Sequence, residues 1–332
     1  RPSPDAASKG RPGMRVTLHV GLPKTGTTSI QAFLERHRAA LRERGVLYPI
    51  AGWPTDHGRS SQVTAWLMAA DDDHVDDCRM REGVAEPAAL AAFRARRGAD
   101  LAAEIAAARP AHLLISCEHL SARVHTRSEF RRLADWAGSL GGPVRVVLFL
   151  REQADFLASA YAERMRSGGS EAFSLEEAGP ADRPEPTGGR FRAPWFLRYD
   201  RLIDAWAEVF GEGAIAVRLM RDPARDGGVV DAFAEAAGLG DLSGWSRPEP
   251  QRVAPSALAV RLMRWHNLAV PRYRRGVQNP RWRAGRLERL SAQAPGRPFR
   301  LPPASDRLLR SRYAVGNTDI ARRWFGRERL FD

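Results

Sequence analysis

This 332-residue chain has few lysines and few cysteines, and it contains no long apolar run. Its two cysteines, Cys78 and Cys117, are far apart in sequence, so neither a disulfide framework nor a cysteine-based metal site is predicted. No stretch approaches the roughly 18 apolar residues of a membrane span, and the beginning lacks the pattern of a secretory signal. These absences predict a soluble, cytoplasmic protein with reduced cysteines.

Lysine is the scarcest charged residue, because only Lys9 and Lys24 are lysines among 52 basic residues. Lys9 lies in "RPSPDAASKG", whose composition predicts a disordered tail over residues 1–13, followed by one domain over residues 14–332. Lys24 is then the only lysine of that domain. A chain that otherwise uses arginine but keeps one lysine indicates a task suited to an ammonium group, with chance as the alternative.

Positive charge is concentrated near the end of the chain. Residues 251–332 contain 19 arginines and five acidic residues, a formal net charge of +14, against +13 for the whole chain. Such a segment attracts anions, and nucleic acid, an acidic polysaccharide or a phosphorylated small molecule would each fit.

Apolar runs alternate with helical patterns along most of the chain. Near-continuous apolar runs are typical of strands that are buried on both faces, so an α/β fold is predicted, with a P-loop-type, three-layer arrangement of a mostly parallel central sheet flanked by helices. In such sheets, ligands bind beyond the carboxyl ends of the strands.

Residues 167–194, rich in glycine and proline, predict a functional or disordered loop, such as a lid. Residues 253–332 are Arg-rich and are predicted to be helical, to contain no strand and to belong to the same domain. The predicted strands are 15–21, 45–49, 111–119, 143–151 and 214–220. The main predicted helices are 28–44, 61–70, 87–108, 127–139, 152–167, 198–211, 227–238, 253–268 and 306–325.

The segment "GLPKTGTTS", residues 21–29, joins the first predicted strand to a helix. A glycine-bearing turn of this kind places backbone N–H groups and the positive end of a helix around an anion. Gly21 and Gly26 have the spacing of a nucleotide-hydrolase loop, but Thr27 occupies the position of that loop's lysine. The pattern therefore predicts a phosphate site and disfavours an ordinary ATPase or GTPase.

With Lys24 before the second glycine, "PKTGTTS" resembles the 5′-phosphosulfate loop of the sulfotransferases that use 3′-phosphoadenosine 5′-phosphosulfate (PAPS). The resemblance implies that Lys24 contacts the bridging oxygen of the phosphosulfate. It also implies that Thr25, Gly26, Thr27, Thr28 and Ser29 hold the 5′-phosphate.

A second segment, "REQADFLASAY", resembles the same family, whose members have an arginine at a strand end and a serine eight residues later. Arg151 and Ser159 have this separation, and the resemblance implies that they bind the 3′-phosphate. The sequence departs from many members at Glu152 and Gln153, where Asn or Asp and then Pro are common. The ending "NTDIARRWFGRERLF" resembles endings of bacterial members that modify carbohydrates, and the "RRG" at 274–276 resembles a late basic motif but is expected by chance in so Arg-rich a segment.

The acceptor hydroxyl of such a reaction needs a general base, which the family takes as His or Glu from either of two places. "SCEHLS" offers Glu118 and His119, and "PTDHGRS" offers Asp56 and His57. If the strand continues through both residues, strand alternation sends Glu118 and His119 in opposite directions, so only one of them is expected to face the cleft. We favour Glu118, as the base or as the partner of a histidine, followed by His57 and then His119. A helix-capping Glu118 and a merely solvated His57 are the alternatives.

The predicted function is transfer of a sulfonate group from PAPS, the donor substrate, to an acceptor hydroxyl. The acceptor is expected to be a carbohydrate, and the basic segment is compatible with an anionic one. Neither a metal nor a flavin is implied, and no membrane span is predicted. One alternative is a small-molecule kinase using ATP, in which "HLLISCE" would carry a metal-binding acid. A second is a nucleic-acid-binding module using the basic segment, although no recognition motif is present. A non-catalytic member of the family is a further alternative.

Overall fold

The computed structural model describes residues 13–51, 62–177, 190–221, 228–248, 254–270 and 293–331, with scattered positions between 273 and 289. The chain divides into two compact units, which are described separately. The first unit comprises Arg1–Leu150 and Arg201–Glu249, and the second comprises Arg151–Asp200 and Pro250–Asp332. The predicted tail lies outside the described residues except for Gly13, and the single domain over residues 14–332 stays a prediction.

The first unit is built on a five-stranded sheet in the order β2-β3-β1-β4-β7, with every adjacent pair parallel. The predicted α/β fold with a parallel central sheet is therefore confirmed. Its strands are nearly continuous apolar runs because helices cover both faces. The strands are β1 (Arg15–Val20), β2 (Val46–Leu47), β3 (His112–Ser116), β4 (Val144–Leu150) and β7 (Ile215–Leu219).

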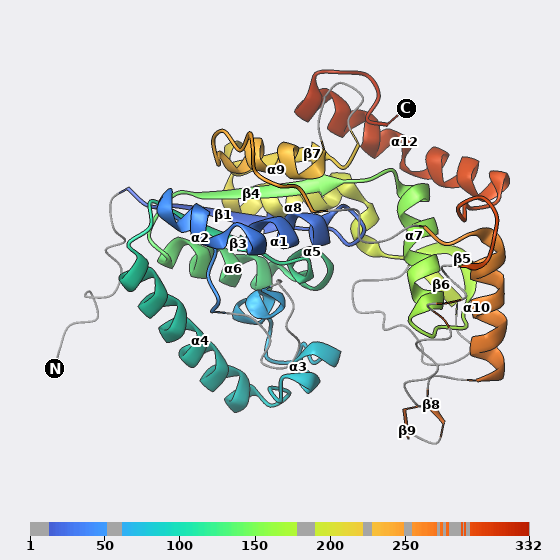
Figure 1. Cartoon of the computed structure of the whole chain (residues 1–332), viewed down its shortest axis with the longest axis horizontal. Coiled ribbons are helices and arrows are strands. Elements are labelled where there is room, and N and C mark those ends of the chain that lie inside the picture. The colour runs from blue at the N-terminus through green and yellow to red at the C-terminus, as the bar shows by residue number, and fades with distance from the viewer. Residues whose placement is uncertain are drawn as a thin grey trace. The chain divides into compact units, whose positions relative to one another are not determined.

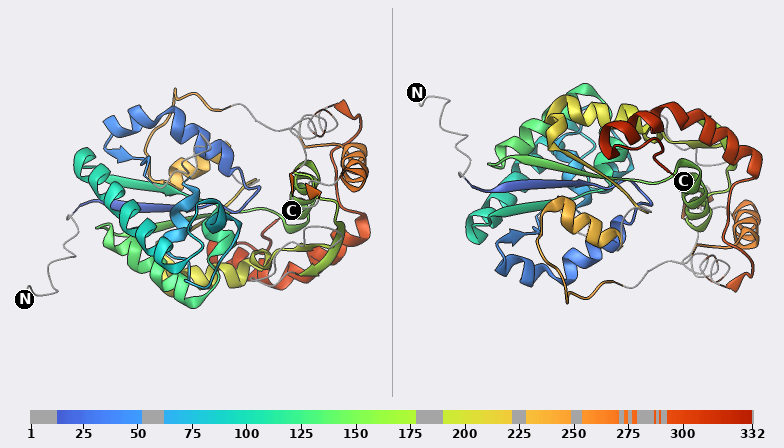
Figure 2. Two further views of the ribbon diagram at one scale, coloured as in Figure 1. Left: turned by 90° about the horizontal axis from the view of Figure 1, so that it is seen from below. Right: turned by 90° about the horizontal axis from the view of Figure 1, so that it is seen from above.

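Helices lie on both sides of this sheet (Figures 1 and 2). Helices α1 (Thr27–Arg36) and α9 (Val229–Ala237) pack on each other over one face, and α6 (Arg127–Ser139) and α8 (Tyr199–Phe210) cover the other. The helix predicted over 28–44 is interrupted at His37, which separates α1 from α2. The remaining helices of this unit are α2 (Arg38–Glu43), η2 (Val63–Met68), α3 (Asp77–Arg81), α4 (Pro87–Ala108), α5 (His119–Arg123) and η4 (Glu212–Ala214).

Cross-strand polar pairs lie within the apolar core between β1 and β3. Thr17 Oγ1 is 2.8 Å from His112 Nε2, and His19 Nδ1 is 2.8 Å from Ser116 Oγ. Burial lowers the pKa of His19 to about 3, so its imidazole is neutral at physiological pH. These histidines are hydrogen-bonded residues of the core.

The second unit packs two helices of the C-terminal segment on α7 (Gln153–Arg166). These are α10 (Ala257–Ala269) and α12 (Pro303–Phe325), which correspond to the two helices predicted there. Asn267 of α10 donates to the carbonyl oxygens of Met165, at 2.7 Å, and of Gly169, at 2.6 Å. The second unit also contains a short 3₁₀ helix, η3 (Trp195–Leu197).

Two parts of the second unit differ from the prediction. The loop predicted over 167–194 contains β5 (Ala172–Glu177) and β6 (Arg190–Ala193), which pair in parallel. Their pairing is supported by Phe173 and Phe191, whose rings stack with centroids 6.2 Å apart. The basic segment predicted to lack strands also contains an antiparallel pair, β8 (Tyr273–Arg274) and β9 (Val277–Gln278).

Arg79 shows how this chain uses arginine inside its fold. Its side chain is fully buried and donates hydrogen bonds to five backbone carbonyl oxygens. The acceptors are those of Val84 (3.0 Å), Asp71 (3.0 Å), Asp72 (3.0 Å), His74 (2.9 Å) and Ala85 (2.6 Å). Such a set needs the planar fork of five N–H donors that only a guanidinium has.

Glu129 organises the residues on either side of the α6 N-terminus. Its buried carboxylate accepts from the His74 ring at 2.6 Å and from the backbone N–H groups of Asp71 (3.1 Å), His125 (3.0 Å) and Thr126 (3.3 Å). Burial alone would raise the pKa of Glu129. The hydrogen bonds from His74, His125 and Asp71 outweigh burial and lower this pKa from 4.5 to about 2.

We predict that Glu129→Gln lowers the free energy of unfolding by about 3 kcal/mol at neutral pH. This is the free energy that corresponds to the lowered pKa of the Glu129 carboxyl. A carboxylate with a depressed pKa stabilises the fold above pH 4.5, and this stabilisation is lost as the pH falls through about 2. Urea unfolding at a series of pH values should therefore show the difference between wild type and variant shrinking as the pH falls.

The matched control is Glu235→Gln, because Glu235 is a half-exposed residue on α9. Its effect should be small and nearly independent of pH. A Glu129→Gln difference that stays constant from pH 5 to pH 2 would contradict the role of the Glu129 carboxylate.

Candidate functional site

The carboxyl end of β1 lies at the point where the strand order reverses. The chain goes from β1 to β2 and β3 on one side of β1, and then to β4 and β7 on the other. Parallel sheets bind their ligands in the crevice beyond such a point. The segment that leaves β1 there is the glycine-bearing turn of residues 21–26.

Both glycines of this turn are required by close contacts. A Cβ at Gly21 would lie 2.5 Å from Thr27 Oγ1, and a Cβ at Gly26 would lie 2.9 Å from the Val229 side chain. Gly26 also has a φ of 86°, in the left-handed region that favours glycine. The turn is therefore clamped between the start of α1 and the start of α9.

Lys24 also adopts a left-handed conformation, with a φ of 63°. For a residue with a side chain this costs about 1–2 kcal/mol. Arg109, with a φ of 47°, is in the same region, but it ends α4 as a helix C-cap, a common place for that conformation. Lys24 ends no helix, so the surrounding turn holds its backbone in a strained state, as is often found at functional sites.

The hydroxyl-bearing residues from Thr25 to Ser29 differ in their exposure to solvent. Thr25 Oγ1 and Thr27 Oγ1 both donate to the carbonyl oxygen of Leu22, at 2.6 and 3.2 Å, and both side chains are buried. Thr28 is exposed and Ser29 partly exposed. Of the predicted phosphate-binding residues, Thr25 and Thr27 thus have only backbone N–H groups to offer, whereas Thr28 and Ser29 also have hydroxyls.

The start of α1 is open to an anion. Gly26 caps the helix without a side-chain hydrogen bond, so the N–H groups of Thr27 and Thr28 receive no side-chain acceptor from the cap. The N–H of Ser29 donates to the Gly26 carbonyl oxygen at 2.9 Å. The helix contains no acidic residue in its first turn. The positive end of the α1 dipole is therefore not neutralised locally.

The end of β3 lies against this turn in the same unit. Ser121 Oγ of α5 lies 2.9 Å from the carbonyl oxygen of Gly21 and 2.9 Å from that of Glu118. The backbone N–H of Cys117 donates to the carbonyl oxygen of His19 at 3.0 Å. The structure thus brings the predicted "SCEHLS" segment next to the start of the phosphate-type turn.

Glu118 and His119 differ in their hydrogen bonding. Glu118 is half-buried and begins α5 without capping it, and among the described residues no hydrogen bond or ion pair to its carboxylate is found. His119 Nδ1 accepts a hydrogen bond from Arg123 Nε. The neutral His119 ring then has its hydrogen on Nε2, so neither nitrogen is ready to accept a proton. His57 and Asp56 lie outside the described residues.

The predicted 3′-phosphate pair belongs to the second unit. Arg151 follows β4 directly in the chain, is half-buried, and accepts a hydrogen bond at its carbonyl oxygen from Tyr199 Oη at 2.7 Å. Ser159 lies two turns into α7 and is also half-buried. Their joint action on one nucleotide stays a prediction.

The departure from the family pattern after Arg151 has a structural explanation. The Glu152 side chain caps α7 by accepting from the N–H of Asp155 at 2.9 Å, a task to which Asn and Asp are also suited. Gln153 is buried and exchanges two amide hydrogen bonds with Asn317, at 2.8 and 3.0 Å. Sequence reasoning missed this pair, although Asn317 opens the "NTDIARRWF" segment.

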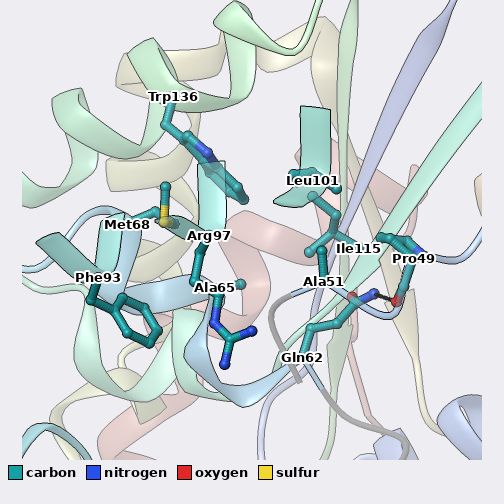
Figure 3. Close-up of a pocket in the computed structure, with 10 residues that line it drawn as sticks. All are labelled: Pro49, Ala51, Gln62, Ala65, Met68, Phe93, Arg97, Leu101, Ile115 and Trp136. Atoms are coloured by element: carbon teal, nitrogen blue, oxygen red, sulfur yellow. Dashed lines mark hydrogen bonds between the residues drawn. The ribbon is translucent and has the colours of Figure 1, made fainter. Parts of the chain in front are cut away.

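A pocket lies on the face of β3 that is covered by α4 and α6 (Figure 3). It has a volume of about 380 Å³, counting the space open to solvent at its mouth. Its apolar wall includes Ile115, Leu101 and Trp136, and Arg97 is its one charged residue, with the guanidinium 5.5 Å from the Phe93 ring centre. No sequence motif indicated it, because its lining comes from several separate elements. The other lining residues are Pro49, Ala51, Gln62, Ala65 and Met68.

One cluster has the residue types of a metal site. Ligand atoms of His74, His125 and Glu129 lie within 4.8 Å of one another. The four N–H groups that Glu129 accepts already use its two oxygens, and His125 Nδ1 donates to the carbonyl oxygen of Arg123 at 2.7 Å. Hydrogen bonding therefore accounts for this cluster as part of the fold.

In comparisons with known proteins, no family model matches the sequence. No curated protein matches it either. Among solved structures, a sulfotransferase domain from the Synechococcus PCC 7002 olefin synthase is similar at 13% identity and a TM-score of 0.35, covering 92% of this chain and 96% of that one. A likeness at this level carries no argument about the present chain.

We predict that the strain at Lys24 can be measured by comparing Lys24→Gly with Lys24→Ala. Both variants lose the ammonium group, but only glycine adopts a φ of 63° without steric cost. Lys24→Gly should therefore be more stable than Lys24→Ala by about 1 kcal/mol, measured by thermal or urea unfolding. Equal stabilities would mean that the turn does not hold residue 24 in the left-handed region.

Proposed function

We propose that this protein transfers a sulfonate group from PAPS to a hydroxyl of an acceptor. The observation that carries the proposal is the turn at residues 21–26, in which Lys24 is held in a left-handed conformation shortly before a helix start that has no side-chain cap. The turn supplies the backbone N–H groups and helix dipole that an anion needs. The resemblance of "PKTGTTS" to the phosphosulfate loop supports the donor's 5′-phosphosulfate as this anion.

Thr27 supports this proposal over an ATP-dependent reaction. It occupies the position of the lysine in nucleotide-hydrolase loops, but its side chain is buried and hydrogen-bonded to Leu22 within the turn. The Thr27 side chain also fills the space beside Gly21. A lysine would have to leave this packed position to reach a phosphate, so the ammonium group of this turn comes from Lys24 instead.

The proposed reaction is an in-line displacement at sulfur. A new bond forms between the acceptor oxygen and sulfur as the bond from sulfur to the bridging phosphate oxygen breaks. Lys24 stabilises the negative charge that develops on that leaving oxygen, and Glu118 accepts the proton of the acceptor hydroxyl. The products are the sulfate ester and 3′-phosphoadenosine 5′-phosphate.

Glu118 is the preferred base because of its position and its free acceptor capacity. It follows β3 at the carboxyl end of the sheet, in the segment tied to the turn through Ser121 and Gly21. His119 is the weaker candidate because its Nδ1 is occupied by Arg123. His57 stays a prediction from the sequence.

On the sequence resemblance, Arg151 and Ser159 are the proposed ligands of the 3′-phosphate of the donor. An arginine gives the bidentate hydrogen bonds that phosphate favours. The proposed acceptor is a carbohydrate, and the charge of +14 over residues 251–332 favours an anionic one. This part rests on the family resemblance and on charge.

We predict that Lys24→Ala lowers kcat for transfer of ³⁵S from labelled PAPS by about 10²–10³-fold, since one group that stabilises the developing charge is lost. The acceptor is first found by a labelling screen of oligosaccharides, phenols and small alcohols. The donor class is tested separately, by thermal shift with 3′-phosphoadenosine 5′-phosphate and with ATP. The proposal fails if neither labelling nor stabilisation by 3′-phosphoadenosine 5′-phosphate is found, or if ATP alone stabilises the protein.

For the base, Glu118→Gln should lower kcat by about 10²–10⁴-fold while leaving the thermal shift by the product nucleotide unchanged. His119→Gln is the matched control from the neighbouring position, and it should have a much smaller effect. A larger loss in His119→Gln than in Glu118→Gln would assign the base to the histidine.

A further inference from the structure

Helix α10 has an apolar face that the second unit leaves exposed. Leu258, Leu262 and Trp265 follow at a spacing of four and three residues and so share one side of the helix, with exposed fractions of 44%, 40% and 72%. Leu268, one turn further, is 54% exposed. We call the surface formed by these four side chains the α10 stripe.

The opposite side of α10 is the one that packs on α7 (Figure 1). Ala259, Val260 and Met263 are buried there, next to Tyr161 and Met165 of α7. The leucines and the tryptophan of the α10 stripe are therefore not needed for this packing. A helix that is apolar on both sides is typical of one that is covered on both sides, and a contiguous exposed apolar surface marks an interaction site.

The charged residues of α10 itself are all basic. Arg261 is exposed and Arg264 half-buried on the same helix, which contains no acidic residue. The whole segment 251–332 has a formal net charge of +14. The partner must therefore accept leucine and tryptophan side chains and be negatively charged.

These requirements separate the kinds of partner. Two copies meeting through their α10 stripes would bring like charges together, which opposes self-association. Nucleic acids and soluble polyanions would pair with the arginines, but they offer no apolar interior to the leucines. A bilayer with anionic lipids offers both, since tryptophan and leucine enter the boundary between headgroups and acyl chains while arginines meet the headgroups.

We infer that the α10 stripe docks this protein on the surface of a membrane containing anionic lipids. None of the described helices is long and apolar enough to cross a bilayer. The association is therefore peripheral, with α10 lying in the plane of the interface. It can be tested apart from the proposed catalytic function, because none of the residues proposed to bind the donor or to act as the base lies on α10.

The test is co-sedimentation of the full chain with vesicles of phosphatidylcholine alone or with about 30 mol% phosphatidylserine, at about 0.05 M and about 0.5 M salt. We expect binding to the phosphatidylserine vesicles at low salt and weaker binding to phosphatidylcholine alone. Trp265→Ser should lower the partition coefficient by at least about tenfold, since the buried indole is lost. Arg261→Gln should weaken binding to the anionic vesicles only.

Val315→Ser is the matched control, because Val315 is an 84% exposed apolar residue on α12, outside the α10 stripe. It should leave vesicle binding unchanged, and all variants should keep the wild-type melting temperature because their sites are exposed. Absence of binding to anionic vesicles would overturn the inference. Binding that salt abolishes but Trp265→Ser does not change would show plain charge adsorption instead. A wild-type dimer that Trp265→Ser dissociates, measured by light scattering, would assign the α10 stripe to a second copy.

Discussion

The contact between Gly26 and Val229 is the constraint on which the candidate site depends. With 2.9 Å between the Val229 side chain and the place of a Cβ, only glycine brings the start of α1 so close to the start of α9. The same helices pack on each other over the sheet. Because Thr27 closes the turn against Gly21 from the other side, the chain has little freedom between them. The left-handed backbone of Lys24 lies within this closed turn.

The scarcity of lysine is better understood beside Arg79. That guanidinium joins five carbonyl oxygens in the interior, a task that a single ammonium with three donors does not fulfil. A preference for arginine thus has structural uses in this fold. Lys24, by contrast, is half-buried in the glycine-bearing turn. Its ammonium group is a compact and strongly hydrated point charge, unlike the planar guanidinium of arginine. Arg79 thus uses its guanidinium to hold the fold together, whereas Lys24 offers an ammonium group in the candidate site.

Much of the fold could be predicted from the sequence, because buried parallel strands appear as apolar runs and α4 begins and ends where its proline and its alanine-rich pattern predict. The glycine spacing of the turn was equally visible. The Glu129 network was not, since its donors come from residues 71 to 126 and include backbone groups. The sequence could have indicated the hydrogen bond from Arg123 to His119, because residues four apart on a helix lie on the same face. The pairing of Phe173 with Phe191 joins segments separated by residues without periodicity, so no local pattern predicted it.

The amide pair between Gln153 and Asn317 spans 164 residues of sequence. All of the first unit has been synthesised by residue 249, whereas the buried start of α7 must wait for α12. During translation the sheet and its glycine-bearing turn can thus fold while residues 151–200 are still without their partners. A ribosome that stops before Asn317 would release a protein with a folded sheet and an unfinished α7.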